Sequence, residues 1–158
     1  MQLHPPTRPW SCILDAFAMA MDIHPNYIIN ELGHDGSEIL WPGNDDPYCR
    51  RGFHIQELIA IAIKNGYSVT EVQTKPLSAP SIVDNMAGHK IINVLDVMRG
   101  NKGVILMQGH AVAWDGVKVY DPRGMTYDTV GDFESFYLIR PTAAISDLKI
   151  KSEVCFLS

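Results

Sequence analysis

The spacing of apolar residues changes character along this chain, and that change most constrains its fold. In the first half, apolar residues recur at helical intervals, which predicts helices over residues 12–22, 25–32 and 55–65. The apolar face of the third helix is expected to contain Ile55, Leu58, Ile59, Ala62 and Ile63. After residue 100, short β-rich runs bounded by turn residues predict strands at 103–108, 110–114, 117–120 and 136–140. A further strand is expected at 67–72 and a helix at about 90–99. Helices followed by an antiparallel meander indicate an α+β fold.

The length of 158 residues suits a single domain. We expect residues 1–141 to form this domain and residues 142–158 to be a C-terminal extension, to which the pattern assigns no structure. Hydrophobic residues make up 46% of the chain and charged residues 20%, which supplies enough apolar material for one core.

The net charge of −5 argues against nucleic acid or an anionic membrane surface as a partner, because both require excess positive charge. No apolar run reaches the roughly 18 residues of a membrane-spanning helix. The first residues, Met1 to Pro6, carry no signal-peptide pattern, so a cytoplasmic protein is expected. Three widely spaced cysteines do not suggest a disulfide framework, and no cofactor-binding motif is present.

Cys12 begins the first predicted helix, directly after Ser11, which we expect to cap that helix. The amide dipoles and unpaired N–H groups at a helix N-terminus stabilise a thiolate and can also bind an oxyanion. A lone cysteine in such a place is more often an inert buried residue. Cys12 is therefore a candidate nucleophile that needs a partner base.

His110 and Asp121 could supply that base and its orienting carboxylate. His110 opens a strand, where an imidazole is held rigidly, and Asp121 ends the next strand. A two-residue hairpin turn at 115–116 would pair position 114 with 117 and, counting outward, His110 with Asp121. Alone, each residue has an ordinary structural explanation. Together with Cys12 they match the nucleophile, base and orienter of a thiol enzyme.

These residues also carry a family resemblance. The segment Trp10-Ser11-Cys12 with its Ala/Met-rich helix, the run 109–116 (GHAVAWDG) and the run 119–122 (VYDP) resemble papain-like cysteine peptidases, in particular the bacteriocin-leader-processing (double-glycine) type. The resemblance spans roughly residues 5–140 and keeps the order Cys, His, Asp. It implies a papain-like fold, with N-terminal helices packed on a C-terminal antiparallel sheet. It also implies Cys12 as nucleophile, His110 as base and Asp121 as orienter.

The resemblance predicts a cysteine peptidase or isopeptidase that cleaves an amide in a peptide or protein substrate through an acyl-enzyme. The family places a Gln several residues before the Cys to bind the oxyanion, but residues 5–11 contain none. Either Gln2, Arg8 or a backbone N–H is expected to replace it, or the oxyanion site is weak. Loss of one such donor typically costs about 10²–10³ in rate. Two alternatives stay open: a transglutaminase-like acyltransferase on the same triad, and a catalytically silent peptide-binding module.

A long Gly- and Pro-punctuated loop over residues 33–53 is expected to lie on the substrate side. The residues predicted to contact substrate are Trp10, His34, Trp41 and Trp114. A metal site in this loop is the weaker hypothesis, because the spacing of its potential ligands fits no zinc pattern. Those potential ligands are His34, Asp35, Cys49 and His54.

Overall fold

The computed structural model of the chain describes residues 1–37, 52–73, 94–128 and 133–142. The helices are α1 (Cys12–Met21), α2 (Pro25–Leu32), α3 (Ile55–Lys64) and α4 (Val94–Met98). The strands are β1 (Tyr67–Gln73), β2 (Gly103–Met107), β3 (His110–Trp114), β4 (Val119–Asp121), β5 (Met125–Tyr127) and β6 (Ser135–Pro141). This order confirms the α+β class. Most of the predicted 33–53 loop, residues 90–93 of the predicted fourth helix and nearly all of the predicted extension lie outside the described residues.

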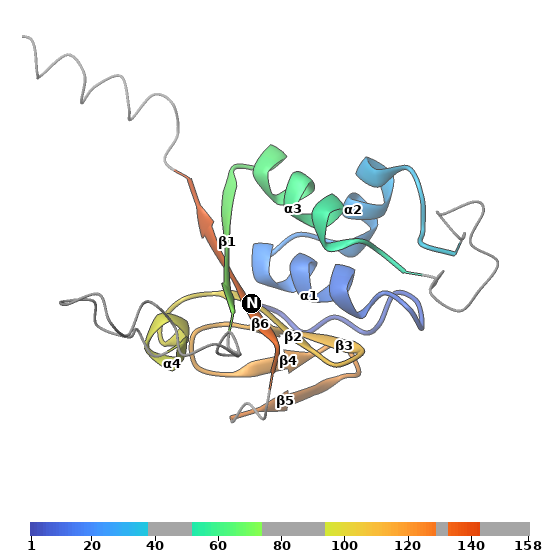
Figure 1. Ribbon diagram of the computed structural model, residues 1–158. Helices are drawn as coiled ribbons and strands as arrows, with labels where there is room; N and C mark the ends of the chain where they lie inside the picture. The colour runs from blue at the N-terminus through green and yellow to red at the C-terminus, as the bar shows by residue number, and fades with distance from the viewer. Residues whose placement is uncertain (38–51, 74–93, 129–132, 143–158) are drawn as a thin grey trace, which may run out of the picture.

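The six strands form one antiparallel sheet in the order β1-β6-β2-β3-β4-β5 (Figure 1). The prediction of a simple meander is therefore wrong at one edge, where β6 inserts between β1 and β2. Pairing of Tyr67–Gln73 with Ser135–Pro141 joins segments that are far apart in sequence. The prediction also missed β5, because this strand has only three residues and all of them are exposed.

Side chains of the central strands alternate between two cores on opposite faces of the sheet. The first core contains Val104, Ala111, Ala113, Tyr137 and Ile139 together with residues of α1, α2 and α3. The second contains Ile105, Val112, Trp114 and Phe136 together with Met98 of α4. The three N-terminal helices thus cover one face of the sheet, with α1 directly against it (Figure 1).

Helix α1 is enclosed on every side. Each residue from Leu14 to Met21 is at most 2% exposed. A helix that is apolar around its whole circumference can be stable in water only when other elements surround it. Here α2 and α3 lie on one side of α1, and β2 and β3 on the other. The Ala-rich sequence of α1 and the two alanines of β3 are small enough to let helix and sheet approach closely.

Helices α2 and α3 lie at the predicted places, but the apolar face predicted for α3 is partly wrong. Its buried residues are Leu58, Ile61 and Ala62, whereas Ile63, which we expected on the same face, is 61% exposed. At 3.6 residues per turn, Ile63 points about 140° away from Leu58. The side of α3 that packs on the neighbouring elements is therefore narrower than its apolar composition suggested.

The turn between β3 and β4 contains four residues rather than the predicted two. Trp114 pairs with Val119, and Asp115 closes the turn by accepting the backbone N–H groups of Val117 and Lys118 at 2.8 and 2.7 Å. Burial raises the pKa of the Asp115 carboxyl, but these two N–H groups outweigh it, so the pKa is lower than usual. Val117, predicted in a strand, is a turn residue and is 68% exposed.

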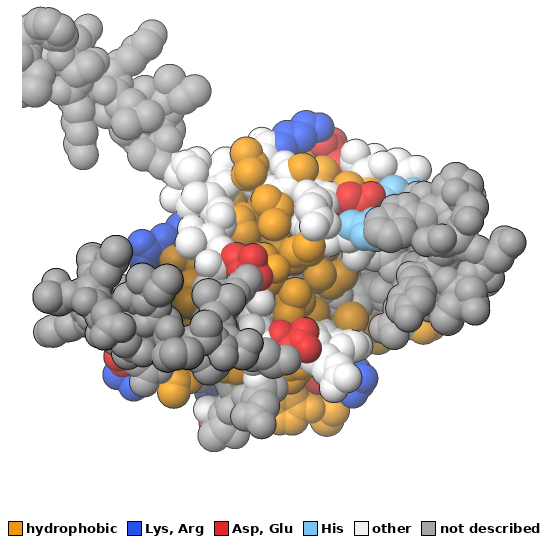
Figure 2. Space-filling view, viewed as in Figure 1, with side chains coloured by type: hydrophobic (Ala, Val, Ile, Leu, Met, Phe, Trp, Pro, Cys, Tyr) orange, Lys and Arg blue, Asp and Glu red, His pale blue; other side chains and the backbone are white. Residues whose placement is uncertain are grey.

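The face shown in Figure 2 has hydrophobic side chains across its middle and separate Lys and Arg side chains near its rim. Within the described ranges, no helix combines the length and the apolar character that crossing a bilayer requires.

Tyr137 of β6 provides a test of the first core. It is 7% exposed, and burial, together with its hydrogen bond to Glu71 and the charge of that carboxylate, raises its pKa to about 12. In the unfolded chain Tyr137 ionises near its ordinary pKa of 10.0. Its contribution to stability is therefore complete below pH 10 and is lost as the pH rises towards 12. We expect the free energy of unfolding in urea to fall by about 2 kcal/mol more for the wild type than for Tyr137→Phe over this range. Equal losses in the two proteins would show that Tyr137 is not shielded.

Candidate active site

The direction of α1 relative to the sheet decides which residues can meet. Lys102, directly before β2, forms an ion pair with Asp22 at the C-terminal end of α1. Strand β2 packs on α1 and runs from this end towards the other, so its turn into β3 lies near the N-terminal end of the helix (Figure 1). A ten-residue helix and a five-residue strand have similar lengths of about 15 Å. Cys12 at the start of α1 and His110 at the start of β3 therefore lie at the same end of the molecule.

His110 and Asp121 form the clearest chemical pair of the site. Nε2 of His110 lies 3.0 Å from Oδ1 of Asp121, and the two side chains are only 13% and 6% exposed. A carboxylate can only accept, so Nε2 carries the proton of the neutral ring and Nδ1 keeps its lone pair. Asp121 is held in turn by the backbone N–H of Arg123, at 2.8 Å from the same oxygen. The pair thus has the geometry of a base and the carboxylate that orients it.

This pair forms although the predicted register was wrong. With Trp114 opposite Val119, the position that faces Asp121 is 112 rather than 110. A shift of two residues leaves a side chain on the same face of the sheet, and diagonal neighbours lie within reach of long side chains. His110 therefore reaches Asp121 diagonally across the hairpin.

Cys12 carries a free thiol, is half-buried and packs against the first core. Between the described residues Cys12 and His110 there is no hydrogen bond. Ala111 belongs to the core around α1 and Val112 to the opposite core, so by alternation His110 leaves the strand on the side of Val112. To contact the sulfur, the imidazole therefore has to reach around the end of β3 to the other face of the sheet. Gly109 has no side chain there, and the space beside it is open.

Ser11 occupies the N-cap position of α1 but does not cap the helix, contrary to the prediction. Its hydroxyl instead lies 2.6 Å from Oδ2 of Asp15, a fully buried carboxylate, and accepts the backbone N–H of Arg8 at 2.8 Å. As a result, the backbone N–H groups of residues 12, 13 and 14 have no hydrogen-bond partner among the described residues. The prediction did not include Asp15. Its position four residues after Ser11, in a helix with no other buried polar residue, was the available signal.

Of the two predicted oxyanion side chains, Gln2 lies at the wrong end of α1. The amino group of Met1 is 3.2 Å from Asp22, the residue after the last turn of α1, so its neighbour Gln2 is separated from Cys12 by the length of the helix. The Arg8 side chain is directed towards the loop after α2, where Nε lies 3.7 Å from Asp35. Ser37 and, to a smaller extent, Arg8 lower the pKa of Asp35. Neither side chain is aimed at the sulfur, which leaves the backbone N–H groups as the expected alternative.

Two of the predicted substrate residues take part in a polar cluster that joins this loop to α3. Nε1 of Trp10 donates to the carbonyl oxygen of Asp35 at 3.1 Å. Nδ1 of His34 accepts the N–H of Gly36 at 3.2 Å, so Nε2 donates to Glu57, 3.1 Å away, while the ring stacks on Phe53. His34 therefore fixes the loop that follows α2.

The other predicted substrate residue within the described ranges, Trp114, lies elsewhere. Trp114 is 9% exposed in the second core, where Nε1 donates to the carbonyl oxygen of Met98 at 2.8 Å. It is a core residue, because the alternation of β3 turns it away from α1. Trp41 lies outside the described residues, as does Cys49 of the metal hypothesis. In the ranges that the structure describes, no three His, Cys, Asp or Glu side chains are grouped to hold a metal ion.

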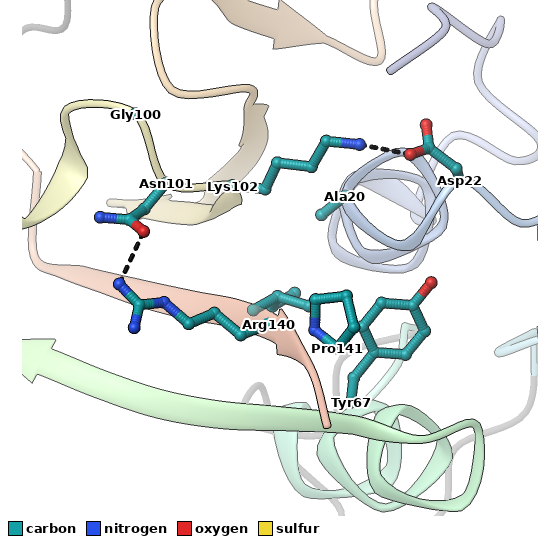
Figure 3. A pocket seen from close by; sticks show the side chains of 9 residues that line it. Ala20, Asp22, Tyr67, Gly100, Asn101, Lys102, Arg140 and Pro141 are labelled. Carbon is teal, nitrogen blue, oxygen red and sulfur yellow. Dashed lines mark hydrogen bonds and ion pairs between the residues drawn. The ribbon is translucent and has the colours of Figure 1, made fainter. Parts of the chain in front are cut away.

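A pocket of about 300 Å³ lies at the opposite end of α1 from Cys12. Tyr67, Ile139 and Pro141 contribute its apolar walls, while Lys102 reaches Asp22 and Arg140 reaches Asn101 across its rim (Figure 3). Burial raises the pKa of Asp22, but Lys102 and the N-terminal amino group outweigh this effect and lower it. The pocket shares no residue with the His110–Asp121 pair.

The cluster around Glu57 predicts an unequal response of two glutamates. Glu57→Ala removes the bond to His34 and the bond from the backbone N–H of His54, 2.9 Å away, which caps α3. We expect a loss of about 1–2 kcal/mol in the free energy of unfolding in urea. As a control, Glu31→Ala removes an ion pair with Lys64, whose side chain is 65% exposed, and should cost clearly less, because solvent screens an exposed pair. Equal costs would contradict the assignment of Glu57 as a structural link.

Comparisons of the chain with protein-family models, curated proteins and solved structures find no match. The resemblance to papain-like cysteine peptidases therefore rests on the residues of this chain alone, and a function has to be argued from the site.

Proposed function

We propose that this protein is a thiol hydrolase of papain-like fold, a cysteine peptidase or isopeptidase in which Cys12, His110 and Asp121 form the triad. The observation that carries the proposal is the His110–Asp121 pair at 3.0 Å, placed at the end of α1 that begins with Cys12. A buried His–Asp pair that leaves Nδ1 free to accept a proton is the arrangement that a general base requires.

In the first half of the reaction, Nδ1 of His110 accepts the thiol proton of Cys12. The sulfur then bonds to the carbonyl carbon of the substrate amide, and the carbonyl π electrons move to oxygen. When the carbonyl re-forms, the C–N bond breaks, and the leaving amine takes the proton from the imidazolium. The products are a free amine and a thioester on Cys12.

In the second half, a water molecule gives a proton to His110 and its oxygen bonds to the thioester carbon. Collapse of this intermediate breaks the C–S bond, releases a carboxylic acid and returns the proton to the sulfur. Asp121 orients the ring and stabilises the imidazolium in both halves. The N–H of Cys12 and its neighbours in the first turn of α1 are the donors available to the oxyanion, in place of the family's Gln.

One observation favours a second candidate, a catalytically silent peptide-binding module on the same fold. Cys12 and His110 share no hydrogen bond, and the imidazole leaves β3 on the side of Val112. Catalytic hydrogen bonds are often long in the absence of substrate, so this geometry is compatible with both functions. Acyl transfer to an amine instead of water would use the same triad, and the two reactions differ only in the acceptor.

Two small reagents test the triad without knowledge of the substrate. Iodoacetamide reports thiolate reactivity, and p-nitrophenyl acetate reports acylation through release of p-nitrophenolate. We expect Cys12 to react faster than Cys49 and Cys155, as measured by mass spectrometry of the labelled peptides. His110→Ala should slow both reactions of Cys12 by about 10²-fold, because the base is lost, and Asp121→Asn should slow them less. Adding an amine acceptor during turnover distinguishes transfer from hydrolysis.

The matched control is His24→Ala. His24 caps α2 and lies beyond the opposite end of α1 from Cys12, so its loss should leave both rates unchanged. Equal labelling of all three cysteines, with no effect of His110→Ala, would reject the hydrolase and favour the silent module.

A further inference from the structure

Asp15 is a buried charged residue that the triad mechanism does not use. Its side chain is completely buried, in a helix whose other residues from Leu14 to Met21 are all apolar. Burying a carboxylate costs desolvation free energy, which hydrogen bonds must offset. An apolar side chain of similar volume would avoid this cost, so the role of Asp15 has to be sought in the groups that it binds.

All hydrogen-bond partners of Asp15 lie in the segment that leads into Cys12. Oδ2 accepts the backbone N–H of Thr7 at 3.1 Å and the hydroxyl of Ser11 at 2.6 Å, and Oδ1 accepts the hydroxyl of Thr7 at 2.6 Å. Ser11 also accepts the N–H of Arg8 at 2.8 Å. The carboxylate therefore ties both ends of the 7–11 segment, Thr7 and Ser11, to the first turn of α1.

This network bears directly on the proposed nucleophile. Cys12 follows Ser11 in the chain, so the orientation of the Ser11 peptide sets the direction of the Cys12 N–H and of its Cα–Cβ bond. In the structure Ser11 has φ −99° and ψ 10°, and its hydroxyl is held away from the helix cap. We propose that Asp15 is a positioning residue that acts through Ser11 and Thr7 to hold Cys12 in register with His110. This inference rests on the proposed function and extends it beyond the triad.

The test compares substitutions that remove or keep the three contacts. Asp15→Ala removes all three bonds. Asp15→Asn can keep them, because its carbonyl oxygen can replace Oδ2 and its NH₂ group can donate to Thr7, whose hydroxyl rotates. If Asp15 acts by position, acylation of Cys12 by p-nitrophenyl acetate should fall about 10- to 100-fold in Asp15→Ala and stay within about threefold of wild type in Asp15→Asn.

A stability control separates positioning from simple loss of folding. Met19→Ala also empties a fully buried site on α1 but removes none of the hydrogen bonds between Asp15 and the 7–11 segment. It should lower the urea midpoint yet keep the acylation rate of the folded protein within about threefold of wild type. Should Asp15→Ala fail to fold, Ser11→Ala replaces it, because this change cuts the link to Cys12 while Asp15 keeps Thr7.

The possible results distinguish failure of the proposed function from failure of the role of Asp15. If wild type and His110→Ala acylate at the same rate, the proposed function fails and the positioning role fails with it. If His110 matters but folded Asp15→Ala, or Ser11→Ala in its place, acylates like wild type, only the role of Asp15 is overturned. A rate in Asp15→Asn as low as in Asp15→Ala would also overturn it, since the charge rather than the contacts would then matter.

Discussion

The enclosure of α1 is the constraint on which the rest of the structure depends. Eight consecutive residues of this helix, Leu14 to Met21, are buried, so the helix is stable only when α2, α3 and the sheet pack around it. The enclosing elements leave only the two ends of α1 near water. Polar groups of this region therefore gather at the ends of the helix, and the two ends differ in how these groups are paired.

At the C-terminal end, charges are neutralised. Asp22 binds both Lys102 and the amino group of Met1, and its own N–H returns to the last turn of the helix. At the N-terminal end, the side chain that could satisfy the helix, Ser11, is turned away towards Asp15. The C-terminal end thus carries ion pairs, whereas at the N-terminal end the backbone N–H groups of residues 12–14, beside the thiol, have no hydrogen-bond partner among the described residues. A helix end without a side-chain cap loses stability, and such a loss is more typical of a functional site than of a structural one.

Local patterns in the sequence were sufficient for most of the elements and for part of the site. The helical spacing around Phe17 predicted α1, and strand alternation predicted β3 with His110 at its start. The His110–Asp121 contact was predicted through a turn of the wrong length, because an error of two residues keeps the same face of the sheet and remains within diagonal reach. An error of one residue would have separated them.

What could not be predicted depends on contacts between distant segments. No local signal shows that β6 pairs with β1, because that pairing is decided when the sheet closes over α1. The distance of Gln2 from Cys12 follows from the ion pair between Met1 and Asp22, which lies at the opposite end of α1 from Cys12. The diversion of Ser11 from the cap follows from Asp15, whose carboxylate is a stronger acceptor for a hydroxyl than any group of the backbone.

Asp15 also bears on the choice between an enzyme and a silent module. A chain that needed only to keep its shape gains nothing from a carboxylate inside an apolar helix, since buried ionic groups seldom stabilise more than well-packed apolar residues. The three contacts of Asp15 instead restrict the one segment that carries the thiol into the helix. In the same way, the N–H of Arg123 restrains Asp121 behind His110. Both halves of the proposed site therefore have a second layer of hydrogen bonds, one around the segment that leads to Cys12 and one around Asp121. Such a layer costs stability and is expected where exact geometry matters, as it does in a catalytic site.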